Sequence, residues 1–170
     1  MRDTEKDYRA LRTIIKTITR TMKIKTATWF ETTIKYEQVG ESGEMKKVSE
    51  TYAIDAMSFT EAEKTMTKEA EETISREYET TAIKIANYKE VLMSDDDRDD
   101  KYYLATLDFI TTSDSGNDKH TKVNYLVQAA TLDKAVKYVN DMMKDSMTDY
   151  KSMSVKETKV VDVLYHDSKE

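Results

Sequence analysis

The sequence predicts an α+β fold of two tandem β-β-α-β units that form antiparallel sheet or sheets with the helices on one side, plus an N-terminal amphipathic helix. Two observations predict it. Like residues recur at an offset of 73 positions, and strand-like alternation and helix-like apolar spacing follow in the same order in both halves. The 170 residues thus divide into a basic N-terminal helix or extension (1–26), a first unit (27–93), an acidic linker (94–100), and a second unit with the C-terminal tail (101–170).

The repeat runs without a gap for about 35 residues. At this offset Tyr36 aligns with Phe109, and Ile54 aligns with Val127. After a deletion of one residue the offset becomes 72, and Val91 aligns with Val163. Because the matches follow the hydrophobic pattern, we interpret them as a duplication.

The first two segments of each unit are predicted to form a hairpin. In the first segment one face carries Phe30, Thr32, Ile34 and Tyr36. This alternation is typical of a half-buried strand. A polar loop, containing Gly43 in the first unit and Gly116 in the second, then returns the chain into a second alternating strand.

Each hairpin leads into a predicted helix, and the first helix has the capping box Ser58-x-x-Glu61. Apolar residues follow at helical spacing in both units. A final strand, around 80–92 and 152–165, closes each unit. One continuous sheet and two packed sheets, related by a pseudo-twofold axis, both remain open. The charge run 94–100 is interpreted as an exposed linker.

The N-terminal extension is predicted to be an amphipathic helix over residues 4–22, with an apolar stripe on one side. The stripe comprises Leu11, Ile14, Ile15, Ile18 and Met22. Met22 could equally be the start codon, which would make the helix an upstream extension.

Composition argues against several classes of function. The chain has no cysteine, which excludes disulfides, thiolate nucleophiles and cysteine-rich metal sites. Its three glycines form no phosphate-binding or dinucleotide-binding motif. His120 and His166 have no histidine counterpart in the repeat, so we expect ordinary surface roles for both. We therefore expect no enzymatic activity, no cofactor and no metal.

Hydropathy argues against a membrane protein. No segment approaches the roughly 18 apolar residues of a membrane span, and the N-terminus lacks the apolar region of a signal peptide. We expect a cytoplasmic protein with no membrane partner.

Two stretches of the chain resemble a known family. They are Thr28 to Glu37, which reads TWFETTIKYE, and Tyr52 to Glu63, which reads YAIDAMSFTEAE. The chain resembles, over about residues 22–165, an uncharacterised family of small proteins from Bacteroidota and their phages and mobile elements. The resemblance implies a setting of phage or mobile-element biology, with the cytoplasm of a bacterial host as the location and no assigned activity.

Aromatic and basic residues suggest a site for single-stranded nucleic acid, because bases stack on exposed aromatic rings while lysines follow the phosphates. The candidates on predicted strands and hairpin loops are Trp29, Lys35, Lys46, Lys47, Tyr88, Tyr102, Lys119 and Lys122. The basic extension adds Arg9, Arg12, Lys16 and Arg20. The competing interpretation of this extension is a helix whose apolar stripe docks on the same subunit or on a neighbouring one.

The leading functional hypothesis is a non-enzymatic phage or mobile-element protein that binds single-stranded DNA or RNA. The overall charge of −6 argues against strong duplex binding, which depends on neutralising phosphates. Two alternatives remain. One is a protein-interaction module, either a homo-oligomeric virion component or an inhibitor of host defence. The other is a binder of a small anionic ligand between the two units.

Overall fold

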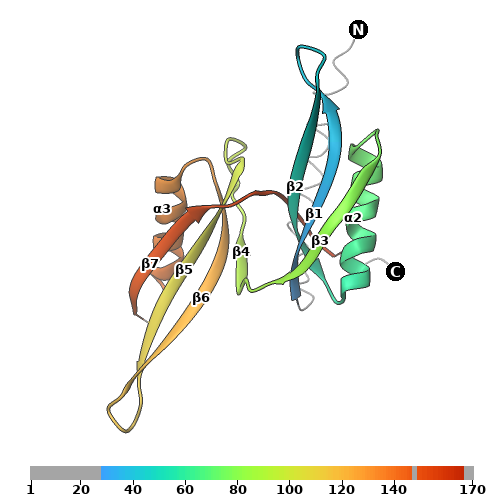
Figure 1. The fold of residues 1–170 in the computed structure, drawn as a ribbon. Coiled ribbons are helices and arrows are strands. Elements are labelled where there is room, and N and C mark those ends of the chain that lie inside the picture. Colours follow the sequence, from blue (N-terminus) through green and yellow to red (C-terminus); the bar gives the residue numbers. More distant parts are fainter. Residues whose placement is uncertain (1–27, 147–148, 167–170) are drawn as a thin grey trace.

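Two four-stranded sheets, each with one helix, make up the computed structural model (Figure 1). The structure describes residues 28–146 and 149–166, so the predicted N-terminal helix lies outside it. The elements in chain order are β1 (Thr28–Val39), β2 (Met45–Ala56), α2 (Phe59–Thr73), β3 (Tyr78–Ala86), β4 (Glu90–Leu92), β5 (Lys101–Thr112), β6 (Asp118–Ala129), α3 (Leu132–Met143), β7 (Tyr150–Glu157) and β8 (Val160–Leu164).

The two predicted hairpins are confirmed. β1 pairs with β2, and β5 pairs with β6, in antiparallel register along their full length. Gly43 and Gly116 close the two turns at φ values of +86° and +78°, a left-handed conformation that glycine adopts without steric cost. The amide of Gly43 donates to the carbonyl of Gly40 at 3.0 Å, and that of Gly116 donates to Ser113 at 2.8 Å.

Side-chain caps begin both helices. The Ser58 hydroxyl accepts from the amide of Glu61 at 3.1 Å, as the capping box predicts. The Glu61 carboxylate accepts from the amide of Met57 at 2.7 Å, one residue before the cap. In α3, Thr131 caps the helix by accepting from the amide of Lys134 at 3.2 Å.

The final strand of each half is where the fold departs from the predicted β-β-α-β unit. Each predicted closing strand is two strands, β3 with β4 and β7 with β8. The first member stays with its own hairpin, whereas the second crosses to the sheet of the other half. β8 pairs in parallel with β2, and β4 pairs in parallel with β6. The first sheet therefore has the order β3-β1-β2-β8, and the second has β4-β6-β5-β7.

Each helix packs on one face of its own sheet and closes a hydrophobic core. Phe30 and Ile54 of the first sheet are buried against Met66 of α2, and Tyr103 and Val127 of the second sheet are buried against Val139 of α3. The exchanged strands contribute to these cores in a reciprocal way. Leu164 of β8 packs in the core under α2, and Leu92 of β4 packs in the core under α3.

A third cluster lies between the sheets and joins them. It comprises Trp29, Ala53, Val91, Tyr102, Leu126, Val160 and Val163. Because the helix-free faces meet here, α2 and α3 lie on opposite outer sides of the molecule (Figure 1), not on one side as predicted. We call this cluster the inter-sheet core.

Replacing Trp29 by alanine is expected to lower the free energy of unfolding by about 3–5 kcal/mol, the usual cost of truncating a core aromatic residue. Trp29→Phe should cost much less, because the indole N–H has no hydrogen-bond partner within the described part of the chain. Urea denaturation measures both effects. The exposed Lys35 on the same strand is the control, where alanine should change stability by less than about 0.5 kcal/mol. Equally small effects at Trp29 and Lys35 would contradict the structural role of the ring.

Candidate functional site

Trp29 and Tyr102, two of the aromatic residues that were predicted to stack on bases, are buried. Trp29 is 5% exposed and Tyr102 is 2% exposed, both in the inter-sheet core. Trp29 packs edge-on against Tyr165 with ring centroids 5.7 Å apart. The prediction that their rings face an open surface is wrong, because the second face of each strand is covered by the other sheet.

Tyr88 is half-buried beside the same cluster, and its hydroxyl donates to the carboxylate of Glu31. Burial, and then this carboxylate, raise the pKa of Tyr88 far above the ordinary tyrosine value. The hydroxyl is therefore engaged within the protein.

The predicted lysines lie on two hairpin ends, which we call the first arm (residues 35–50) and the second arm (residues 108–123). Neither arm contains a buried residue, and the arms point in opposite directions (Figure 1). The five lysines on them, Lys35, Lys46, Lys47, Lys119 and Lys122, are all exposed. They do not line one groove.

Carboxylates stand beside four of these lysines. Lys35 lies opposite Glu79 across β1 and β3. Lys46 pairs with Glu44 at 2.8 Å. Lys47 lies opposite Glu37 across the first hairpin, and Lys122 lies opposite Asp108 across the second. Each arm carries one more acid than Lys and Arg combined, so neither offers the positive surface that phosphate binding requires.

The remaining predicted residues belong to the basic extension, residues 1–26, which we call the head. Arg9, Arg12, Lys16 and Arg20 lie outside the described residues. His120, on the second arm, contacts Asp108 at 3.1 Å. His166 follows β8 and contacts Glu61 in the first turn of α2.

The acidic segment after β4 forms a polar cluster that the sequence did not predict. Asp99 is 2% exposed, although it was expected to be a solvated linker residue. One oxygen of its carboxylate accepts from the amide of Ala130 and from Nζ of Lys134, each at 2.7 Å. The other oxygen accepts from the Tyr138 hydroxyl at 2.7 Å and from the Ser94 hydroxyl. The segment is thus fastened to the start of α3.

Charge is balanced within this cluster. Lys134 also contacts Asp96 at 2.7 Å, and Asp96 binds Arg98 through both carboxylate oxygens at 2.8 and 2.9 Å. Burial by itself raises the pKa of Asp99, but the hydrogen bonds from Lys134, Ser94 and Tyr138 outweigh it and hold that pKa below its ordinary value. The carboxylates of Asp96 and then Asp99 raise the pKa of Lys134.

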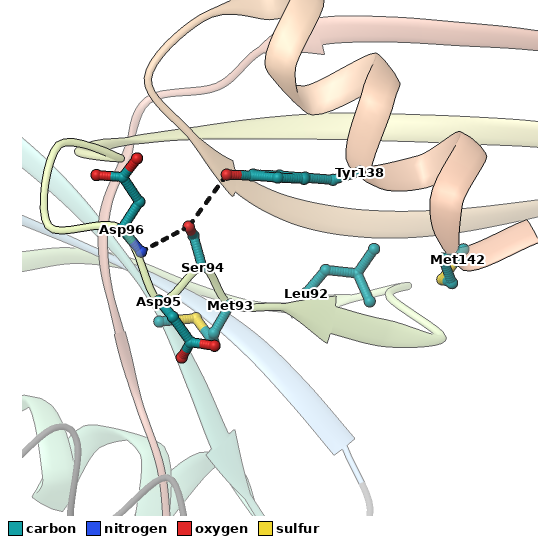
Figure 2. A pocket seen from close by; sticks show the side chains of 7 residues that line it. All are labelled: Leu92, Met93, Ser94, Asp95, Asp96, Tyr138 and Met142. Atoms are coloured by element: carbon teal, nitrogen blue, oxygen red, sulfur yellow. Dashed lines mark hydrogen bonds between the residues drawn. The ribbon is translucent and has the colours of Figure 1, made fainter.

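A groove of about 450 Å³ opens beside the cluster (Figure 2). Its lining combines apolar side chains with carboxylates and hydroxyls: Leu92, Met93, Ser94, Asp95, Asp96, Tyr138 and Met142. Figure 2 shows the Ser94 hydroxyl between the amide of Asp96 and the hydroxyl of Tyr138. This lining suits an apolar side chain with a positive group beside it.

The Ser94 hydroxyl donates to a carboxylate, and both histidines of the chain lie elsewhere, so the groove lacks the Ser–His pair of acyl transfer. Within residues 28–146 and 149–166, no three histidine or acidic side chains converge as a metal site would require. The helices in that same part of the chain are too short or too polar to cross a membrane.

Asp99→Asn is expected to destabilise the fold by about 1–3 kcal/mol at neutral pH, because it weakens the pairing of Lys134 and neighbouring donors. A carboxylate with a lowered pKa contributes stability that is present above its unfolded pKa of about 3.9 and is lost as the pH falls through the folded value. The wild-type melting temperature should therefore fall more steeply below about pH 4 than that of the variant.

Asp97→Asn, which changes an exposed carboxyl of the same segment, is the matched control. If it altered the acid dependence as much as Asp99→Asn does, the buried cluster would not be the cause.

Comparisons with known proteins place the chain in a family. The model of a domain of unknown function, DUF4494, matches residues 28–166. No curated protein and no solved structure matches. The match covers both sheets, both arms and the groove. The chain therefore belongs to the DUF4494 family, whose function is unknown.

Proposed function

We propose that this protein is a non-enzymatic interaction module that assembles with further copies of itself, the first arm of one copy entering the groove of the next. The observation that carries the proposal is an apolar pair at the tip of the first arm. Val39 and Met45 lie opposite each other across the hairpin and are 44% and 56% exposed. An exposed apolar pair on a projecting hairpin suits a buried contact with a partner.

Charge supports a protein partner. Residues 28–166 carry 18 Lys and Arg against 28 Asp and Glu, a net charge of −10. Such a body repels phosphate chains as a whole. Protein partners need local complementarity instead, which the mixed charge of the arms provides.

The arm and the groove are chemically complementary. On the arm, Lys47 and the opposite Glu37 share the face of Val39 and Met45. In the groove, the apolar side chains of Met93 and Met142 lie with the exposed Asp95, whereas Asp96 pairs with Arg98 and Lys134. Because the two surfaces differ, the contact is head-to-tail, and repetition gives a ring or a filament. In the phage setting that the resemblance implies, this would suit a virion component.

We also propose that the two halves of the fold arose by duplication. The order of elements is the same in both halves, and the exchanged strands are reciprocal. Two polar cross-strand pairs support it, Thr33 with Thr51 at 2.9 Å and Thr106 with Asn124 at 2.7 Å, since they lie 73 residues apart. The second arm nevertheless lacks the apolar pair, because Thr112 and Asp118 occupy the equivalent positions.

Single-stranded nucleic acid binding is the second candidate, and the basic head favours it. Residues 1–26 carry eight Lys and Arg against three acids. With the stacking aromatics buried and the arm lysines offset by carboxylates, we assign this candidate to the head alone.

Self-assembly predicts that the sedimentation coefficient of the wild-type protein rises with concentration. The double variant Val39→Ser/Met45→Ser should stay monomeric at concentrations where the wild type associates, because the apolar contact is removed. Thr112→Ser/Asp118→Ser, at the matched positions of the second arm, should associate like the wild type. A wild type that is monomeric throughout, or equal effects of both variants, would refute the arm-in-groove contact.

Titration of a fluorescent oligonucleotide tests the second candidate at several salt concentrations. Binding through the head should weaken steeply with salt and be lost in Arg12→Glu/Arg20→Glu, because counterion release drives it. Lys46→Glu/Lys47→Glu should leave it nearly unchanged. If only the arm variant lost binding, the assignment to the head would be wrong.

A further inference from the structure

Three large apolar side chains are exposed at one corner of the first sheet. Met57, Phe59 and Ile85 are 70%, 50% and 60% exposed. Phe59 packs edge-on against Phe30 at 5.0 Å between ring centroids, and Ile85 lies opposite Phe30 across β1 and β3. Phe59 and Ile85 therefore flank one buried ring on the helix-bearing face. We call these three residues the entry corner.

The chain enters the fold at this corner. Thr28, the first residue of β1, lies opposite Ala56, the residue before Met57. His166, just after β8, contacts Glu61 in the first turn of α2. Both ends of the described chain thus meet the start of α2 (Figure 1).

In the second half, the segment that precedes the hairpin binds beside the start of the helix. There the segment that precedes β5 is residues 94–100, and its Asp99 binds the amide of Ala130 and the side chain of Lys134 at the start of α3. The counterparts of Met57, Phe59 and Ile85 are Ala130, Leu132 and Glu157, so that corner keeps one large exposed apolar side chain where the entry corner has three. At this less apolar corner, the segment that binds beside the start of the helix is polar.

We propose that the segment preceding β1 does the same for the first half: residues 4–22 dock their apolar stripe on the entry corner of the same molecule. Burial of the exposed apolar side chains of the entry corner against other apolar side chains is favourable, and the stripe from Leu11 to Met22 provides such side chains. The charges are complementary too. The head carries a net charge of +5, and residues 28–93, with eight Lys and Arg against fourteen acids, carry −6.

The connection is long enough for docking within one molecule. Six residue steps join Met22 to Thr28, and an extended chain covers at most about 3.6 Å per step, or about 20 Å in all. Thr28 itself lies at the corner. The tether keeps the local concentration of the head high, so docking within one molecule outcompetes docking between molecules at low protein concentration.

Cysteine cross-linking tests the proposal in the full chain, which has no cysteine of its own. Phe59→Cys is combined in turn with cysteine at a stripe position, Leu11, Ile14, Ile15 or Ile18, or at a polar position, Arg9, Arg12, Lys16 or Arg20. After treatment with a short bis-maleimide in dilute solution, the stripe variants should give a monomeric cross-linked product and the polar variants little. Equal yields on both faces, or a dimeric product that dominates even on dilution, would overturn docking within the molecule.

Tryptic cleavage within the head gives a second readout that does not depend on the cysteines. Phe59→Ser/Ile85→Ser should release the head and speed its cleavage by about tenfold, because cleavage follows the open population. Leu132→Ser, at the position equivalent to Phe59 and 46% exposed, should leave the cleavage rate unchanged. Thermal denaturation shows that each variant is folded before digestion. A head that is cleaved equally fast in all three proteins would refute the proposal.

Discussion

The reciprocal exchange of β4 and β8 is the constraint on which the rest of the structure depends. Each strand is short, with three and five residues, yet each contributes to two cores at once. On β4, Val91 packs between the sheets while Leu92 packs under α3; on β8, Val163 and Leu164 do the same for the first sheet. The exchange also fixes the relative position of the sheets. This in turn buries Trp29 and Tyr102 and sends the two arms in opposite directions.

Much of the fold could be predicted from local patterns. Alternation in β1 and β5, the turn glycines and the capping box are all local signals, and the hairpins and helices follow them. The division of residues 80–92 into two strands could not be predicted, because it depends on where β6 lies in space. The same limit applies to Trp29. A period of two separates the faces of a strand but does not reveal that a second sheet covers the other face.

The candidate site depended still more on tertiary contacts. Among five acids between residues 94 and 100, composition cannot single out Asp99, whose burial requires Lys134 and Tyr138 on the facing helix. Their spacing of four residues, which places both on one face of α3, was the available signal. The arm lysines were visible in the sequence. The carboxylates that offset them, such as Glu37 opposite Lys47, follow only from the strand register.

The exchange has a consequence for the order of events during synthesis. The first sheet includes β8, the last strand of the described chain, so the ribosome must deliver nearly all of the described chain before that sheet can close. The pairing of β2 with β8 joins residues about a hundred positions apart, and contacts so distant in sequence form slowly. Until then, one edge of β2 and part of the first hydrophobic core stay uncovered. This exposure favours aggregation or binding by a chaperone. Completion of the second half ends that exposure.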